Sequence, residues 1–150
     1  MSESVGRTGA PPAQRFTSEH QVSLLVSGFE SGLLPRGRWT HAAHLAVVTW
    51  YLRRYPESDA TERMIAGIQR YNRASGSDGY HETITLFWLA LVRRFLQGIE
   101  DASVLEAING VIAEFGHNPC LILEYYSRDR INSLQARQTW VDPDRKSLDE

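Results

Sequence analysis

The chain has 150 residues, a formal net charge of −2, and hydrophobic and aromatic fractions of 42% and 10%. This length and composition are typical of one globular domain and exclude a largely disordered or repetitive protein. Neither charge sign gathers into a run, so nucleic acid is not expected as a partner. No apolar run reaches membrane-spanning length, and the first fourteen residues lack the apolar segment of a secretory signal. We therefore expect no membrane partner and a cytoplasmic location.

The apolar residues recur at helical spacing, which predicts an all-α fold: a single compact bundle of about five to six helices with short loops. We expect a flexible N-terminal lead-in over residues 1–15, one helical domain over 16–142 and a frayed tail over 143–150. The predicted helices, in chain order, run from Thr17 or Ser18 to Gly32, Thr40 to about Tyr55, Ser58 toward Gly76, near Tyr80 to Gln97, Asp101 to Gly116, and Asn118 through Tyr126. Beyond Ser127 the pattern allows a further helical turn.

The segment Trp39-Thr40-His41-Ala42-Ala43-His44-Leu45 opens the second predicted helix with two histidines one turn apart. At about 100° per residue, both imidazoles fall with the apolar residues in a sector roughly 120° wide. Ala42, Ala46, Thr49 and Arg53 fall on the other side of that helix. We therefore expect His41 and His44 to point into the interior.

A second histidine-bearing segment, Gly79-Tyr80-His81-Glu82-Thr83, opens the fourth predicted helix. His81 falls near the middle of the apolar face, with Thr85 one turn further along and Glu82 at its edge. In the sixth predicted helix, Glu124 lies on the side of Cys120. Either carboxylate could complete a site with the histidines.

Three inward histidines favour a metal site, because a bare imidazole nitrogen in an apolar face costs about 1–3 kcal/mol. One divalent ion, Zn or Fe, bound by His41, His44 and His81 would satisfy them and leave an open coordination position. Glu82 or Glu124 would ligate, or act as general base toward a bound water, in a hydrolytic or redox enzyme. The single cysteine excludes a cysteine-based zinc motif and an internal disulfide.

Two metal-free interpretations stay open beside this one. The histidines, with Tyr80 and Thr85 lining the same pocket, could bind a small organic or anionic molecule without chemistry. Alternatively, each histidine is a core residue bonded to a backbone carbonyl or a neighbouring hydroxyl, and the chain is a helical interaction protein. His20 and His117 are expected at the surface. The sequence does not decide whether the protein is an enzyme, its substrate or its oligomeric state.

The two histidine motifs, together with Tyr125-Tyr126-Ser127, Ala136-Arg137 and Trp140-Val141-x-Pro143-Asp144, resemble those of a group of small bacterial all-α proteins. The resemblance spans most of residues 29–144 and implies a bacterial, cytosolic origin, but no activity is attached to the group. The chain is also faintly similar to helical-bundle proteins that bind a metal through three histidines. It lacks the late His-x-x-x-His pair of that family, so no ligand is transferred from it.

Overall fold

A computed structural model describes residues 15–149 and confirms the predicted all-α class. Within this range the backbone forms eight α-helices, five of them seven residues or longer, and no strand. The five long helices are α2 (Glu19–Ser31), α3 (His41–Arg54), α4 (Glu57–Ala74), α5 (Glu82–Gln97) and α6 (Val104–Phe115). A 3-10 turn, η1 (Arg36–Arg38), precedes α3, and three short helices follow α6: α7 (Ile122–Tyr125), α8 (Arg128–Ile131) and α9 (Leu134–Gln138). The expected flexible lead-in over residues 1–15 lies, except for Arg15, outside the described residues.

Several helix ends follow directly from capping chemistry. The hydroxyls of Ser18 and Thr40 accept backbone N–H groups of the first turns of α2 and α3, as their residue types predict. Gly32 ends α2 in the left-handed conformation, with φ of 76°. The start of α6 differs from the prediction, because Ser103, rather than Asp101, forms a capping box with Glu106.

Helix α3 lies at the centre of the bundle and contacts α2, α4, α5 and α6. Its residues from Leu45 to Tyr51 are all buried, so the helix is enclosed on every side rather than along one stripe. Ala42, Ala46 and Thr49, expected on a side away from the apolar face, are buried too, and the Thr49 hydroxyl donates to the Leu45 carbonyl oxygen at 2.8 Å. His41 and His44 are only half-buried.

Helices α2 and α4 approach each other closely at Gly67. A Cβ atom added to Gly67 would lie 2.6 Å from the ring of Phe29, which is fully buried. The ring of Phe29 also stacks on that of Trp39, with centroids 4.5 Å apart. Gly67 therefore creates the space that lets an aromatic cluster form beside the start of α3.

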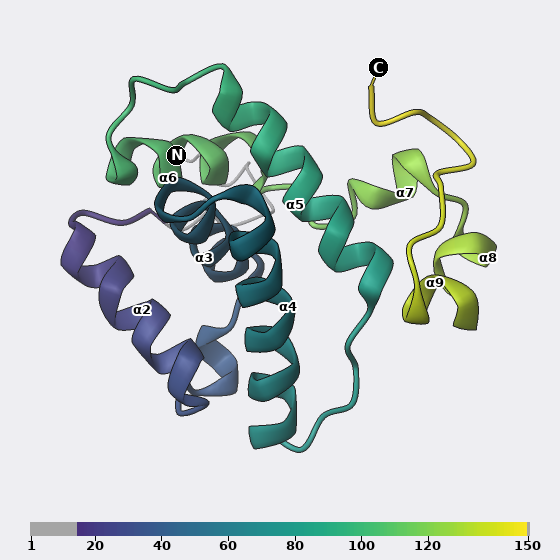
Figure 1. The fold of residues 1–150 in the computed structure, drawn as a ribbon, viewed down its shortest axis with the longest axis horizontal. Helices are drawn as coiled ribbons and strands as arrows, with labels where there is room; N and C mark the ends of the chain where they lie inside the picture. The colour runs from purple at the N-terminus through teal and green to yellow at the C-terminus, as the bar shows by residue number, and fades with distance from the viewer. Residues whose placement is uncertain (1–14, 150) are drawn as a thin grey trace, which may run out of the picture.

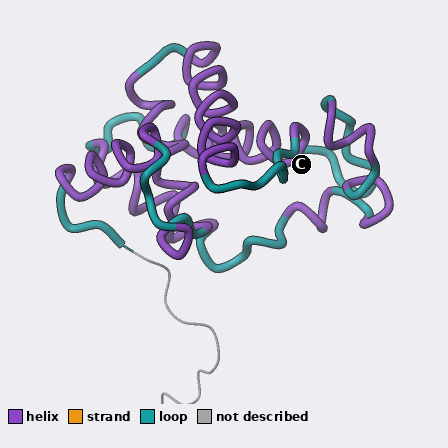
Figure 2. The backbone as a smooth tube through the Cα atoms, turned by 90° about the horizontal axis from the view of Figure 1, so that it is seen from below, coloured by secondary structure: helices purple, strands orange, loops and turns teal. Residues whose placement is uncertain are grey.

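The three short helices and the tail, residues 120–149, form a separate group on the far side of α5 (Figures 1 and 2). We call this group the C-terminal unit. Thr83 of α5 connects the C-terminal unit to the bundle. Its hydroxyl donates to the Thr139 carbonyl oxygen at 2.8 Å and accepts from the Val141 N–H at 3.2 Å. The Tyr126 hydroxyl donates to the Val141 carbonyl oxygen at 2.7 Å.

The tail, expected to fray, lies against the domain up to the end of the described range. The Arg145 N–H donates to the Tyr125 carbonyl oxygen at 2.8 Å, and the Arg94 guanidinium donates to the Leu148 carbonyl oxygen. The Lys146 ammonium lies 5.0 Å from the centre of the Tyr125 ring, a cation–π contact. These contacts give residues 143–149 a defined path along α7 and α5.

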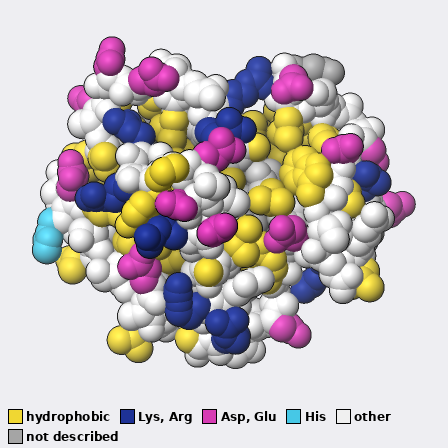
Figure 3. Space-filling model, in the orientation of Figure 1, with side chains coloured by type: hydrophobic (Ala, Val, Ile, Leu, Met, Phe, Trp, Pro, Cys, Tyr) yellow, Lys and Arg dark blue, Asp and Glu magenta, His cyan; other side chains and the backbone are white. Residues whose placement is uncertain are grey.

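Basic and acidic side chains alternate over the face of the molecule shown in Figure 3, with apolar atoms between them. That arrangement agrees with the near balance of sixteen basic and eighteen acidic residues in the sequence. Among residues 15–149, no helix has both the length and the apolar character needed to cross a membrane.

Candidate functional site

His41 lies in the first turn of α3 and connects it to the end of α6. Its Nε2 atom lies 3.1 Å from the Phe115 carbonyl oxygen, and the ring packs edge-on against Trp88 with centroids 4.9 Å apart. Since a carbonyl only accepts, Nε2 carries the proton in this contact. Burial lowers the pKa of His41, and the bond to the Phe115 carbonyl opposes that shift. The His41 imidazole thus donates a hydrogen bond to a backbone carbonyl at the C-terminal end of α6.

His44 lies one turn later, beside the ring of Trp39 at a centroid distance of 5.5 Å. Loss of hydration, and next the charge of His41, lower its pKa to about 4. The ring is therefore neutral at neutral pH. In the neutral form one ring nitrogen keeps a free lone pair, which makes His44 a possible base or ligand.

His81 is the N-cap of α5 and not a residue on its apolar face. Its Nδ1 accepts the Ile84 N–H at 3.1 Å, and its Nε2 lies 2.7 Å from the Ile131 carbonyl oxygen at the end of α8. Nδ1 must therefore be the acceptor and Nε2 the donor, so both ring nitrogens are occupied. Helix α5 begins at Glu82, two residues later than the predicted start near Tyr80.

The remaining candidate residues, which are Tyr80, Glu82, Thr85 and Glu124, lie at two separate places in the fold. Tyr80 donates its hydroxyl to Glu82 at 2.5 Å, and burial, followed by the charge and hydrogen bond of Glu82, raises the pKa of Tyr80. The buried Thr85 hydroxyl donates to the His81 carbonyl oxygen at 2.9 Å. Glu124 is exposed on α7, at the surface of the C-terminal unit. Tyr80, Glu82 and Thr85 thus gather at the start of α5, apart from the predicted partner Glu124.

These positions do not assemble the predicted three-histidine ligand set. Among residues 15–149 no group of three or more His, Cys, Asp or Glu side chains has the arrangement needed to hold a metal ion. His81 could ligate only by giving up the α5 cap or its bond to the Ile131 carbonyl, and His41 already uses Nε2. The donor set therefore does not fit a resident Zn or Fe ion.

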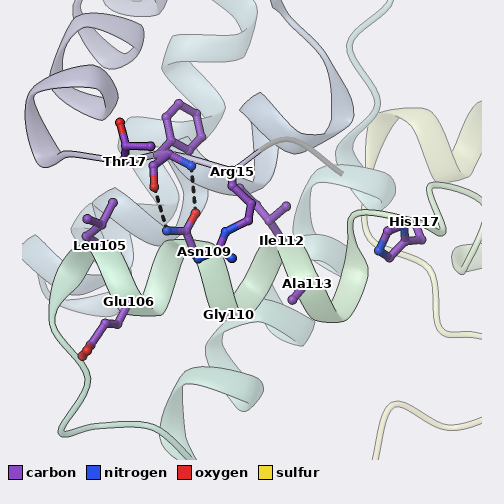
Figure 4. Close-up of a pocket in the computed structure, with 10 residues that line it drawn as sticks. Arg15, Thr17, Leu105, Glu106, Asn109, Gly110, Ile112, Ala113 and His117 are labelled. Carbon is purple, nitrogen blue, oxygen red and sulfur yellow. Dashed lines mark hydrogen bonds between the residues drawn. The ribbon is translucent and has the colours of Figure 1, made fainter. Parts of the chain in front are cut away.

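A large hollow lies elsewhere, along one face of α6. It has a volume of about 940 Å³, and we call it the α6 groove. Its lining surface is mainly apolar in area, although half of its ten lining residues are polar or charged (Figure 4): Arg15, Phe16, Thr17, Leu105, Glu106, Asn109, Gly110, Ile112, Ala113 and His117. None of the residues proposed from the two histidine motifs lines it, and His117 is exposed, as predicted for a surface group.

Asn109 is the polar centre of the α6 groove. Its Oδ1 accepts the Phe16 N–H at 2.9 Å, and its Nδ2 donates to the Phe16 carbonyl oxygen, also at 2.9 Å (Figure 4). One side-chain amide thereby satisfies both backbone groups of a residue 93 positions away. The arrangement binds a polypeptide backbone whatever its side chain, as a neighbouring strand would.

Neither Phe16 nor Asn109 belongs to a motif that marks a site in the sequence. The only signal was weak: Asn109 is an amide among the apolar residues of the fifth predicted helix, and Phe16 is a single aromatic residue ahead of the first. A polar residue in an apolar helix indicates a need for a partner, because buried amides are nearly always hydrogen-bonded. It does not say which segment supplies the partner.

Comparisons with known proteins add no relative. No family model, no curated protein and no solved structure matches this chain.

Proposed function

We propose that the protein is a helical interaction module that binds an extended polypeptide segment in the α6 groove. The observation that supports this function is the pair of hydrogen bonds between Asn109 and the backbone of Phe16, inside a groove whose lining surface is mainly apolar in area. Paired backbone hydrogen bonds give affinity for a chain in general, and the apolar surface beside them gives selectivity for its side chains. This is the interaction-protein interpretation of the sequence, with the site moved to α6.

The groove has room for more than the residue it already holds. Leu105 lies toward the start of α6 and Ala113 toward its end, one on each side of Asn109 (Figure 4). A volume of about 940 Å³ lies near the upper end of the range for ligand sites, roughly 300–1,000 Å³. A short peptide placed along α6 would therefore bury several side chains at once.

The hydrogen bonds of the motif histidines support the same proposal. His41 and His81 each use a ring nitrogen on a backbone carbonyl in another part of the fold, at 3.1 Å and 2.7 Å. Groups committed in this way act as structural contacts between elements. The metal-dependent hydrolytic or redox function suggested by the motifs would require those bonds to break before a ligand set could form.

A titration of the full chain with a synthetic peptide tests the proposal. The probe is Ala-Gln-Arg-Phe-Thr-Ser, the sequence of residues 13–18, followed by amide chemical shifts in ¹⁵N-labelled protein. We expect shifts along the groove at Leu105, Asn109 and Ala113. N109A should lose them, because it removes both backbone hydrogen bonds.

The matched control is E114A, because Glu114 is exposed on the same helix and does not line the groove. E114A should respond to the peptide like the wild type. Shifts centred on His41 and His44, or no saturable shifts in α6 at millimolar peptide, would overturn the peptide-binding function.

A further inference from the structure

We propose that Phe16 is an internal ligand that occludes the Asn109 site of the α6 groove, and that the groove is built for an extended segment anchored by an aromatic residue. This inference rests on the peptide-binding function proposed above and adds the class of ligand and its regulation. It begins with the contrast between Phe16 and its neighbours. Phe16 is only 6% exposed, whereas Arg15 and Thr17 on either side are both exposed. One ring is inserted, and the chain around it stays at the surface.

Phe16 also stands between two hollows. The α6 groove lies on one side, and a second hollow of about 370 Å³ lies on the other, between α2 and the start of α3. Arg15 and Phe16 line both, and the second is completed by Gln21, Leu24, Leu25, Leu34, Arg38 and Ala43. Removal of the Phe16 ring would therefore join the two hollows into one longer groove.

The segment can leave without disturbing α2. The helix has its own cap, because the Ser18 hydroxyl accepts the Gln21 N–H at 3.2 Å. The Gln21 side chain in turn accepts the Thr17 N–H at 2.7 Å. Rotation of the backbone ahead of Ser18 would thus release Phe16 from Asn109 while the first turn of α2 keeps its hydrogen bonds.

The contacts that Phe16 makes indicate the kind of ligand that could replace it. An incoming chain must offer a backbone N–H and C=O of one residue to Asn109 and an aromatic ring to the space that Phe16 fills. Aromatic side chains contribute large buried area with few rotatable bonds, which suits a single anchoring position. We infer that the groove binds aromatic-anchored extended segments and not aliphatic ones.

Variants at position 16 test the occlusion with the same Ala-Gln-Arg-Phe-Thr-Ser peptide. F16A removes the ring that anchors the segment, and F16W keeps an aromatic ring there. We expect F16A to bind the peptide at least about tenfold more tightly than the wild type, because apparent affinity falls with the fraction of molecules whose site is free. F16W should bind as weakly as the wild type, and the peptide Ala-Gln-Arg-Ala-Thr-Ser should not bind F16A.

The possible results separate the two proposals. Equal affinity of wild type and F16A would overturn occlusion while the groove remains a peptide site. Saturable binding of the alanine peptide to F16A would overturn the aromatic anchor. If neither protein bound either peptide, the proposed function itself would fail.

A second measurement avoids dependence on the folding of F16A. 4-Fluorophenylalanine at position 16 of the full chain reports the burial of that ring by ¹⁹F NMR. Saturating phenylalanine peptide should move the resonance to its solvent-exposed position. An unchanged resonance together with shifted α6 amides would show that the ring stays seated, and would overturn occlusion.

Discussion

The starts of α3 and α5 look alike in the sequence, because each has an aromatic residue and a histidine ahead of an apolar helix. Their histidines nevertheless make different hydrogen bonds. At α3, Thr40 is the cap, and His41 is free to donate to the Phe115 carbonyl of α6. At α5, His81 is itself the cap and also donates to the Ile131 carbonyl of α8. The α3 start therefore contains two partly buried imidazoles close together, and the α5 start contains one whose hydrogen bonds are complete.

This difference shows that the physical role of a histidine depends on which groups already satisfy the helix end. At α3 a threonine accepts the first-turn N–H, so the nearby imidazoles are available for tertiary contacts. Their burial then disfavours the protonated form and lowers their pKa. Where the imidazole takes the cap, its tautomer is fixed and its second nitrogen can only donate. The comparison predicts unequal responses to acid and to mutation.

Acid should affect the α3 start most. His44 has a pKa of about 4 in the folded state and 6.5 ordinarily, so between these values the unfolded chain binds a proton that the folded chain does not. Stability is then complete above about pH 6.5 and falls as the pH drops toward 4, by an amount on the order of 3 kcal/mol. Urea unfolding of wild type and H44Q at pH 7 and pH 4.5 measures it.

The H44Q variant should lose most of that pH dependence, because glutamine does not titrate in the range. L24A, a change at an exposed residue that does not titrate, serves as the control and should keep the slope of the wild type. An equal slope in wild type and H44Q would contradict the assignment of the acid sensitivity to the α3 start.

Loss of the His81 imidazole should cost more at neutral pH than any other change at the two starts. H81L leaves the Ile84 N–H without its cap and the Ile131 carbonyl without its donor, for a loss of about 2–3 kcal/mol. H81N can still cap the helix but is too short to reach Ile131, so it should lose about half as much. Urea unfolding at pH 7.5 compares the two. If H81L unfolded with the same free energy as the wild type, neither hydrogen bond would contribute to stability.

The His41 contact should contribute least. H41F keeps an aromatic ring against Trp88 and removes only the donor to the Phe115 carbonyl, for an expected loss of about 1 kcal/mol at pH 7.5. The ranking of H81L above H41F is the direct test of the comparison between the two helix starts. The reverse ranking in the same unfolding experiment would contradict it.

Much of the fold could be predicted because the relevant signals are local. The caps Ser18 and Thr40, the Gly32 stop and the apolar period of each long helix act within a few residues, and the structure contains the corresponding helices. Helical geometry placed His41 and His44 together at one helix start for the same reason. The side of α3 that carries the two histidines is no more buried than the rest of the helix, since a central helix is covered by neighbours all round.

The candidate site could not be predicted in the same way, because its partners lie far apart in the sequence. Phe115 is 74 positions from His41, Ile131 is 50 from His81, and Asn109 is 93 from Phe16. By itself the sequence determined the all-α class, the order of the long helices and the presence of two histidine-bearing helix starts. Only the tertiary structure decided what each polar side chain binds, since a hydrogen-bond partner is set by which segments packing brings together and not by the local period of apolar residues.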